Sequence, residues 1–394
     1  MWQSLPRAFF FNEQAYSGED QISKEVELDR LVGDIDASAF EASASPLETK
    51  RRLKSVRSRV QKSIVPMLHS FGCNIGPEMQ ESLSRVTDEF ISEAYDFDPS
   101  LTEEAVYQAS RNVMIMNTFQ MHLGKKVTLT PSIFAYSLLY PYTDNYLDAA
   151  DVDEDSKNEA NKRLESRLCG FAQAPICRSE EFIDRLVGKI EGEFDRIQYP
   201  RVFQSLLAIH RAQVRSVSQQ NAVFLPAQNE LLDISIEKGG TSVLADGFLV
   251  AGDLSDAHMK FFFRFGVVLQ LIDDLQDIEE DIAANQRTLV GDAVDCGTLE
   301  HFSDRLFSFL TLTLTTGCRE ERDLYQLIER SCRLLVLESI AANASYYNSA
   351  YLEHTERRSP VRFAYLSDLR RRLRQGLDKV SIASSARRAA MTAY

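Results

Sequence analysis

The feature that most constrains the fold is an apolar segment, 265–281, that ends in a dense set of acidic residues. No proline interrupts it, so we expect it to form one helix. At 3.6 residues per turn, Asp273, Asp277 and Asp281 lie one turn apart on one face, with Asp274 beside them. Like charges stacked in this way destabilise a helix unless a cation neutralises them. Carboxylates on a rigid element suit Mg2+, so these four aspartates are candidate metal ligands.

A solvated acidic face is the alternative interpretation of this segment. Apolar side chains occupy much of the circumference of the same helix, however, and such a helix is usually buried. The residues concerned are Val267, Val268, Leu271, Ile272, Leu275 and Ile278. Burial favours the metal site.

Helical periodicity extends through most of the chain. We expect helices around 77–95, 102–122, 130–148, 155–170, 179–194, 199–222, 229–251, 255–285, 298–315, 320–353 and 361–379, and from about Pro46 onward. Strand-like alternation is almost absent, so the fold class is all-α. Most prolines lie between these segments, but Pro66 and Pro141 lie inside helical patterns, where a kink or break is expected. No linker divides the chain. We predict a loosely structured extension (1–45), one all-α domain (46–380) and a C-terminal tail (381–394).

Composition excludes several classes of function. The formal net charge of −14 disfavours nucleic acid as the main partner, because phosphate repels an acidic surface. No stretch of 18 apolar residues exists, so no transmembrane segment is expected, and no secretory signal is visible. The six cysteines are scattered without a CxxC pair, which predicts reduced thiols in a cytoplasmic protein.

A second acidic pair, Asp144 and Asp148, lies upstream on one face of the helix expected around 130–148. Such a pair is most often a surface accident. Two carboxylate-bearing helices could, however, face each other across a cavity and hold metal ions between them. Such a site suits a diphosphate. The metals and nearby Lys or Arg would neutralise its charge as a C–O bond breaks.

These motifs together resemble the class I isoprenoid (terpenoid) synthase superfamily, and its trans-prenyl diphosphate synthase branch in particular. Phe265-Gly266, Gln270 and Asp273-Asp274-Leu275-Gln276-Asp277 are similar to the FG…Q…DDxxD motif of that branch. Lys238-Gly239-Gly240-Thr241 resembles its KT motif, Ala212-Gln213-Val214-Arg215-Ser216 stands where the branch has GQxxD, and Asp144-Asn145-Tyr146-Leu147-Asp148 stands at the first acidic motif. The resemblance covers roughly 130–290 and implies a helical bundle around a central cavity, about three Mg2+ ions and a prenyl diphosphate substrate; homodimers are common in the family.

The resemblance also implies roles for individual residues. Asp144, Asn145 and Asp148 would bind Mg2+ on one wall, and Asp273, Asp274 and Asp277, completed by Asp281, on the other. The diphosphate would meet Lys238, Arg211, Arg215 and Arg287, although each cation could instead be solvated or paired with a structural acid. Phe134, Tyr136 and Tyr140 would face the cavity and stabilise a carbocation, or else belong to the ordinary core.

Departures from the pattern distinguish the activities within the superfamily. Chain-elongating enzymes carry a GGKR-type motif and an arginine pair after the first acidic motif, and this chain has neither. Asp273, Asp277 and Asp281 have the spacing of the NSE metal triad of terpene cyclases. We therefore predict a terpene synthase, a carbon–oxygen lyase acting on one allylic prenyl diphosphate. The alternatives are a chain-elongating prenyltransferase, a head-to-head synthase of the squalene/phytoene type, and a non-catalytic helical scaffold.

Overall fold

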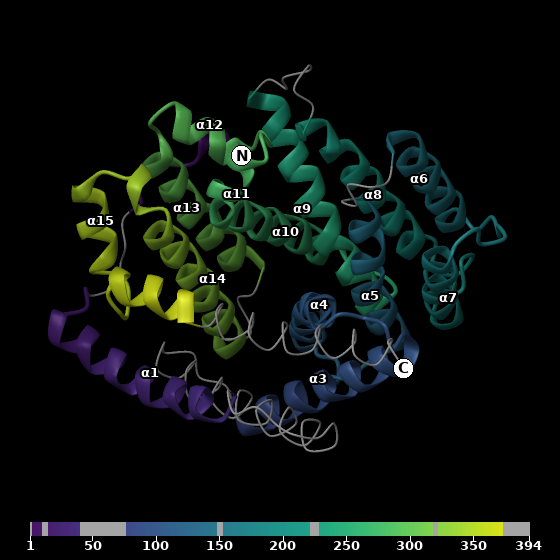
Figure 1. Ribbon diagram of the computed structural model, residues 1–394, viewed down its shortest axis with the longest axis horizontal. Helices are drawn as coiled ribbons and strands as arrows, with labels where there is room; N and C mark the ends of the chain where they lie inside the picture. The colour runs from purple at the N-terminus through teal and green to yellow at the C-terminus, as the bar shows by residue number, and fades with distance from the viewer. Residues whose placement is uncertain are drawn as a thin grey trace, which may run out of the picture. The chain divides into compact units, whose positions relative to one another are not determined.

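The computed structural model describes residues 2–9, 15–39, 76–147, 153–220, 228–317 and 322–372. These residues are helical almost throughout and include no strand, which confirms the all-α prediction (Figure 1). None of the helices in this part of the chain is long and apolar enough to cross a membrane.

Most helices follow the sequence pattern. Their bounds are η1 Trp2–Ser4, α1 Gly18–Ala39, α3 Pro77–Phe97, α4 Glu103–His122, α5 Pro131–Leu147, α6 Glu154–Leu168, α7 Arg178–Glu193, α8 Pro200–Ser216, η2 Val217–Gln220, α9 Gln228–Ala251, α10 Asp256–Gln276, α11 Ile278–Ala283, α12 Leu289–Asp295, α13 Leu299–Gly317, α14 Arg322–Ala342, η3 Ala344–Tyr346 and α15 Ser349–Glu356, followed by a helix over 363–372. Of these, α1 and α12 were not expected. The prediction of a loosely structured extension over 1–45 is wrong for α1, a 22-residue helix within it.

Two of the expected helices are interrupted. The segment expected at 255–285 divides at Asp277 into α10 and α11, and the one expected at 320–353 divides into α14, η3 and α15. The periodicity that begins at Pro46, including Pro66, lies outside the described residues.

The described chain forms two compact units. The first contains the described parts of 1–80, 293–308 and 325–394, and the second those of 81–292 and 309–324. The sequence predicted one domain over 46–380. The unit boundaries fall inside α3, α12, α13 and α14, so no linker marks them.

In the first unit, the N-terminal helix α1 is fixed to the C-terminal segment. The buried carboxylate of Glu25 accepts hydrogen bonds from the Arg362 side chain, with Nη2 at 2.5 Å, and from its backbone N–H at 2.8 Å. Gln21 donates to the carbonyls of Glu356 and Ser359. Trp2 packs on Phe302 with their ring centroids 5.4 Å apart. Contacts distant in sequence therefore hold this unit together.

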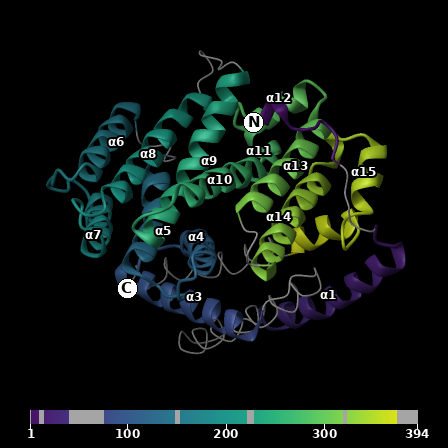
Figure 2. The ribbon, with the colours of Figure 1, turned by 180° about the vertical axis from the view of Figure 1, so that it is seen from behind.

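In the second unit, α9 is the central helix. It packs most extensively against α10 and α8 and also contacts α4 and α5, while α7 packs on α5 and α6 on α8. The two views show α9 beside α10 (Figures 1 and 2). Both helices are apolar on average, as expected for elements surrounded by others.

Small residues bring the backbones of α9 and α10 into direct contact. A Cβ atom on Gly266 would lie 2.0 Å from the carbonyl oxygen of Gly239, and one on Gly239 would lie 2.5 Å from Gly266 O. Gly240 gives the same space to the ring of Phe263, and Gly247 to that of Phe262. Only glycine permits this approach, which brings the chemical groups of the two helices together.

Pro141 lies inside α5, and the helix continues for six residues beyond it. Proline has no N–H, so the carbonyl oxygen of Ser137, four residues earlier, loses its usual helical donor. The expected break at Pro141 does not occur within the described helix.

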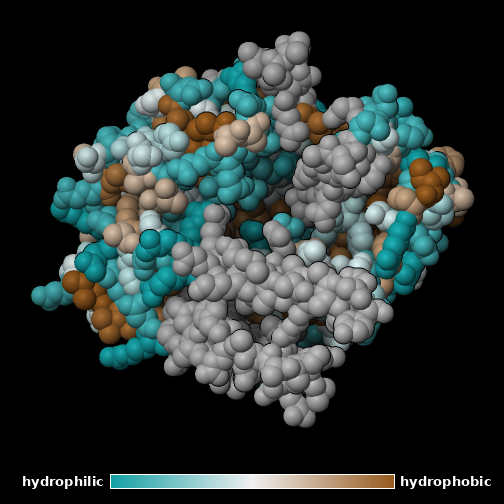
Figure 3. Space-filling view, in the orientation of Figure 1, coloured by the Kyte–Doolittle hydropathy of each residue, from teal (hydrophilic) through white to brown (hydrophobic). Residues whose placement is uncertain are grey.

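The described surface is mostly polar on the face in Figure 3, and its hydrophobic patches are small and separate. This distribution agrees with the acidic composition of the chain.

Candidate functional site

A cavity of about 400 Å³ lies among the helices of the second unit. Its apolar wall comes from α4, α5, α6 and α8 and includes Ile115, Leu139, Leu164, Leu168, Leu206 and Ile209. Asp273 and Asp277, from the end of α10, also line it. Because the Asp273 side chain is exposed to solvent as well, the acids lie where the cavity opens. Gln108, Arg111, Thr143, His210 and Gln213 line the cavity too, so the space combines an aliphatic surface with polar groups and with carboxylates.

The one-turn spacing of the acids holds although α10 ends at Gln276. The Asp277 N–H donates to the Asp273 carbonyl at 3.1 Å, and the Asp281 N–H donates to the Asp277 carbonyl at 2.8 Å. These i→i+4 bonds continue the helical path across the junction with α11. The three acids thus share one side of the chain, as predicted.

The pKa of Asp281 shows how closely the acidic groups lie. Partial burial raises the pKa of this carboxyl to about 7, and the charges of Asp274, Asp277 and Asp273 contribute in the same direction. The charge of Lys238 opposes the increase. A cation at this place would relieve the repulsion among the four carboxylates.

Asp274 differs from its neighbour Asp273 in its surroundings. It is buried between α10 and α9, where Oδ1 accepts from Gln270 Nε2 at 2.8 Å and Oδ2 accepts from Ser235 Oγ at 3.1 Å. Burial raises the pKa of this carboxyl to about 6, although Gln270 and Lys238 act to lower it. Gln270, predicted only as part of a motif, is the residue that orients Asp274.

Lys238 reaches the acids from α9. The Gly239–Gly266 contact lies immediately beside it, and its charge lowers the pKa of both Asp274 and Asp281. No ion pair within 4 Å joins Lys238 to another described residue. A cation that acts on several carboxylates without belonging to one of them is suited to an added anion.

The three predicted arginines are engaged elsewhere. Arg211 pairs with Glu165 of α6 at 2.7 Å, and Arg215 with Glu237 of α9 at 2.5 Å. Arg287 pairs with Asp292 at 2.6 Å. None of the three lines the cavity. The alternative of pairing with structural acids describes them better than the expectation of a diphosphate contact.

The predicted cavity aromatics are separated by helix geometry. Tyr136 lines the cavity, whereas Phe134 is fully buried against Phe90 and Phe97 on another side of α5. Residues two apart on a helix point about 200° apart, so both cannot face one cavity. For Tyr140, only its backbone position in α5 is described.

The first acidic motif is described only in part. Asp144 and Asn145 belong to the last turn of α5, but their side chains, and all of Asp148, lie outside the described residues. Thr143, directly before them, lines the cavity. The proposed ligation by this motif stays a prediction.

Several polar residues of the cavity wall were not anticipated, among them Gln108 and Arg111, and neither was a hydrogen-bonded group of three at this wall. Asn112 of α4 and Ser137 of α5 line the cavity, and Asp246 of α9 lies directly behind Asn112. A signal for Asp246 existed in the sequence: Ser235, Lys238, Ser242 and Asp246 recur at three- and four-residue intervals along α9. Asn112 and Ser137 carried no such pattern.

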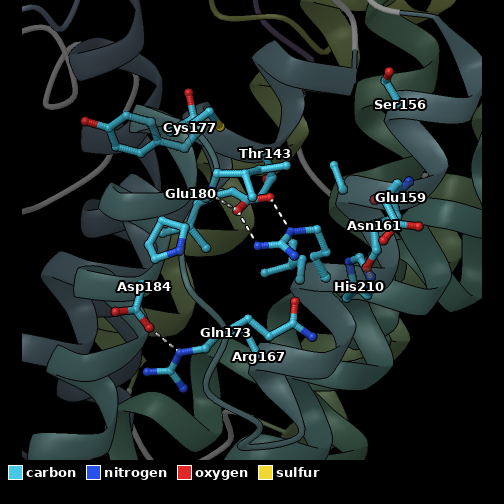
Figure 4. Close-up of a pocket in the computed structure, with 18 of the residues that line it drawn as sticks. Thr143, Ser156, Glu159, Asn161, Arg167, Gln173, Cys177, Glu180, Asp184 and His210 are labelled. Atoms are coloured by element: carbon cyan, nitrogen blue, oxygen red, sulfur yellow. Dashed lines mark hydrogen bonds and ion pairs between the residues drawn. The ribbon is translucent and has the colours of Figure 1, made fainter.

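A second cavity, of about 290 Å³, adjoins the first (Figure 4). Thr143, Leu164, His210 and Gln213 line both. Its charged groups are paired: Arg163 Nε donates to Glu180 at 2.8 Å, and Arg167 Nε donates to Asp184 at 2.5 Å. His210 contacts the Asn161 carbonyl at 3.1 Å, and burial lowers the pKa of its ring. This second space lacks the acidic cluster of the first.

The described residues include no group of three or more His, Cys, Asp and Glu side chains arranged to hold a metal by itself. Mg2+ is commonly bound by one or two carboxylates together with substrate phosphates and waters. The oxygen donors of Asp273, Asp277 and Asp281, with their mutual repulsion, fit a site that such a substrate completes.

No protein-family model matches this chain, and no curated protein matches it.

Proposed function

We propose that the protein is a magnesium-dependent class I terpene synthase that acts on a single allylic prenyl diphosphate. One observation supports this most strongly: a cavity among helices, with an aliphatic surface from α4, α5, α6 and α8, is lined by Asp273 and Asp277, and the charges of Asp281 and Lys238 act on the same cluster. An apolar chamber excludes water from a reactive cation, and the charged entrance suits a metal–diphosphate group.

In the proposed reaction, the C–O bond to diphosphate breaks and leaves an allyl cation in the cavity. Lys238 would bind the diphosphate oxygens and stabilise the charge that develops on them. Asp273 and Asp277, with Asp281 beside them, would help to hold Mg2+ together with the substrate, and the metal would supply positive charge for the departing diphosphate. Asp274 is a positioning residue, because Gln270 and Ser235 occupy both of its oxygens.

The wall of the cavity would direct the cation. Aliphatic side chains of α4, α5, α6 and α8 exclude water and fold the chain, and the ring of Tyr136 can stabilise positive charge by a cation–π interaction. The final proton would be taken by diphosphate, because no Ser/His/Asp or Cys/His group is recognisable in the sequence.

The proposed location is the cytoplasm. Cys169, Cys177 and Cys296 are exposed free thiols, and Cys332 is a buried one. Unpaired surface thiols are typical of a reducing compartment.

The test is incubation of the purified chain and Mg2+ with each prenyl diphosphate from C10 to C25, with and without isopentenyl diphosphate, followed by mass spectrometry. The proposal expects a hydrocarbon or alcohol from one allylic substrate alone. A longer diphosphate formed only with isopentenyl diphosphate would instead identify a chain-elongating prenyltransferase. A condensed product with two joined chains would identify a head-to-head synthase, and absence of any turnover would favour a helical scaffold.

A further inference from the structure

Asn112, Ser137 and Asp246 bring polar groups from three helices to one place in the cavity wall. Asn112 Nδ2 lies 3.2 Å from Ser137 Oγ, 3.2 Å from Asp246 Oδ1 and 3.5 Å from Met116 Sδ. Asn112 and Ser137 line the cavity themselves. Gln108, Arg111, Tyr136 and Ser242 also line the cavity, so polar side chains of α4, α5 and α9 share this part of its wall.

The trio lies about two helical turns along α9 from Lys238. Ser242 and Asp246 follow Lys238 at four-residue intervals and therefore share a face of α9. Eight residues of helix correspond to about 12 Å along the axis. Ser242 lines the cavity between the two levels. A chain whose diphosphate meets Lys238 and Asp273 would extend toward the trio.

The trio has more hydrogen-bonding capacity than its own members use. One amide NH2 group, that of Asn112, serves three acceptors, while no donor among the described residues hydrogen-bonds to Asn112 Oδ1 or Asp246 Oδ2. Ser137 Oγ accepts from Asn112, and as a donor it makes only a weak contact, 3.9 Å, with Met116 Sδ. Pro141 also removes the helical donor from the Ser137 carbonyl. A buried water usually has two to four such partners.

We propose that Asn112, Ser137 and Asp246 hold a water molecule in the cavity wall, and that this water captures the carbocation, so that the product is a terpene alcohol. The inference rests on the proposed function and adds the class of product to it. If the trio only joined α4, α5 and α9, we would expect Asn112 Oδ1 and Asp246 Oδ2 to accept hydrogen bonds from the described residues as well.

Atoms and electrons balance in the capture step. The water oxygen gives an electron pair to the cationic carbon and forms a C–O bond, and one water proton leaves. The released diphosphate accepts that proton, and Ser242 lies between the two places on the same face of α9. Burial raises the pKa of the Asp246 carboxyl well above its usual range, which favours its protonated form.

The experiment is turnover of the accepted prenyl diphosphate in water enriched in oxygen-18, with products and released diphosphate both quantified. Wild type should give a labelled alcohol. In Asn112→Leu, the ratio of alcohol to hydrocarbon should fall by about tenfold or more, because a polar partner of the water is lost, while diphosphate release continues. Ser137→Ala should shift the ratio in the same direction and removes only one atom from the fold.

Asn117→Leu is the matched control. Asn117→Leu makes the same substitution on the same helix, α4. Asn117 is fully buried and does not line the cavity. It should leave the product ratio unchanged, and thermal unfolding should show that all three variants are folded. Diphosphate release with only hydrocarbon products, or an alcohol fraction indifferent to both Asn112→Leu and Ser137→Ala, would overturn the water site and leave the proposed function intact. If no substrate leads to diphosphate release, both the water site and the proposed function are refuted.

Discussion

At the scale of single residues, Asp273 and Asp274 of the acidic motif have different surroundings. Asp273 is exposed at the cavity entrance, whereas Asp274, about 100° further around the helix, is buried and bonded to Gln270 and Ser235. The sequence identified the motif but treated both as metal ligands. Burial, which separates them, depends on the packing of α9 and has no signature in the motif itself.

Removing the Gln270 amide should disturb the acidic cluster without removing an acid. Gln270→Leu leaves Asp274 Oδ1 without its donor, so the apparent Mg2+ affinity in turnover should fall by about 10- to 100-fold. A Mg2+ titration of activity measures this. Gln276→Leu makes the same change one residue from Asp277 and should alter the titration little; equal curves for both variants would refute the positioning role of Gln270.

Lys238 is the predicted diphosphate cation. Lys238→Met keeps the length of the side chain and removes its charge, so kcat/KM should fall by about 100-fold or more. Arg211→Met is the control, since Arg211 pairs with Glu165 and is absent from the cavity wall. Steady-state kinetics decide between them. A larger loss for Arg211→Met would return the diphosphate site to the arginines.

The raised pKa of Asp281 predicts a pH dependence of stability in the absence of metal. The folded state holds this proton more tightly than the unfolded state, whose carboxyl has its ordinary pKa near 3.8. The contribution to stability is therefore present below about pH 4 and is lost as pH rises to about 7. Asp281→Asn removes this loss, so its Tm relative to wild type should increase between pH 5 and pH 7.5.

Thermal unfolding at the two pH values, with EDTA present, measures the difference. Asp233→Asn, at an exposed position of α9, is the control for the loss of one negative charge. A Tm difference for Asp281→Asn that is the same at both pH values would show that Asp281 is not crowded by the other acids.

At the scale of elements, the α9–α10 contact positions the site. Gly239 and Gly266 allow the two backbones to touch, and this contact places Lys238 and Ser235 against the acids of α10. The sequence showed Lys238-Gly239-Gly240 and Phe265-Gly266 as separate motifs. Their pairing could not be predicted, because glycine leaves no apolar pattern from which a contact can be read.

Gly266→Ala should be costly for this reason. Its Cβ would lie 2.0 Å from the carbonyl oxygen of Gly239, and backbone cannot move aside as a side chain can. The free energy of unfolding should fall by about 1–3 kcal/mol, as in other overpacked interiors. Gly188→Ala, in a helix with nothing within 4 Å of the new Cβ, should instead stabilise by about 0.5–1 kcal/mol. Denaturant unfolding of both variants measures the contrast, and equal changes would contradict the close approach.

Helix positions were largely predictable from periodicity, and side-chain partners were not. The expected helix at 199–222 contains α8, yet its Arg211 and Arg215 bond to Glu165 and Glu237, each on a different element. Such pairs depend on which helices are neighbours. Likewise, the face of α5 that carries Tyr136 rather than Phe134 meets the cavity. One helix with apolar residues all round gives no indication of which face that is.

At the scale of the whole molecule, the sequence predicted the fold class and one domain, and the described chain forms two units. The boundaries within α3, α12, α13 and α14 are not visible in the sequence, because each helix continues through its boundary. The candidate cavity lies entirely within the second unit, so that unit alone supplies its lining residues.

The most direct test of the central claim is the rate of diphosphate release from a single allylic prenyl diphosphate, with Mg2+ and without isopentenyl diphosphate. We expect the wild-type chain to release diphosphate and Asp273→Ala to lose at least about 100-fold of that rate, because the carboxylate proposed to hold Mg2+ for the leaving group is gone. Release at equal rates from both proteins, or from neither, would contradict the account.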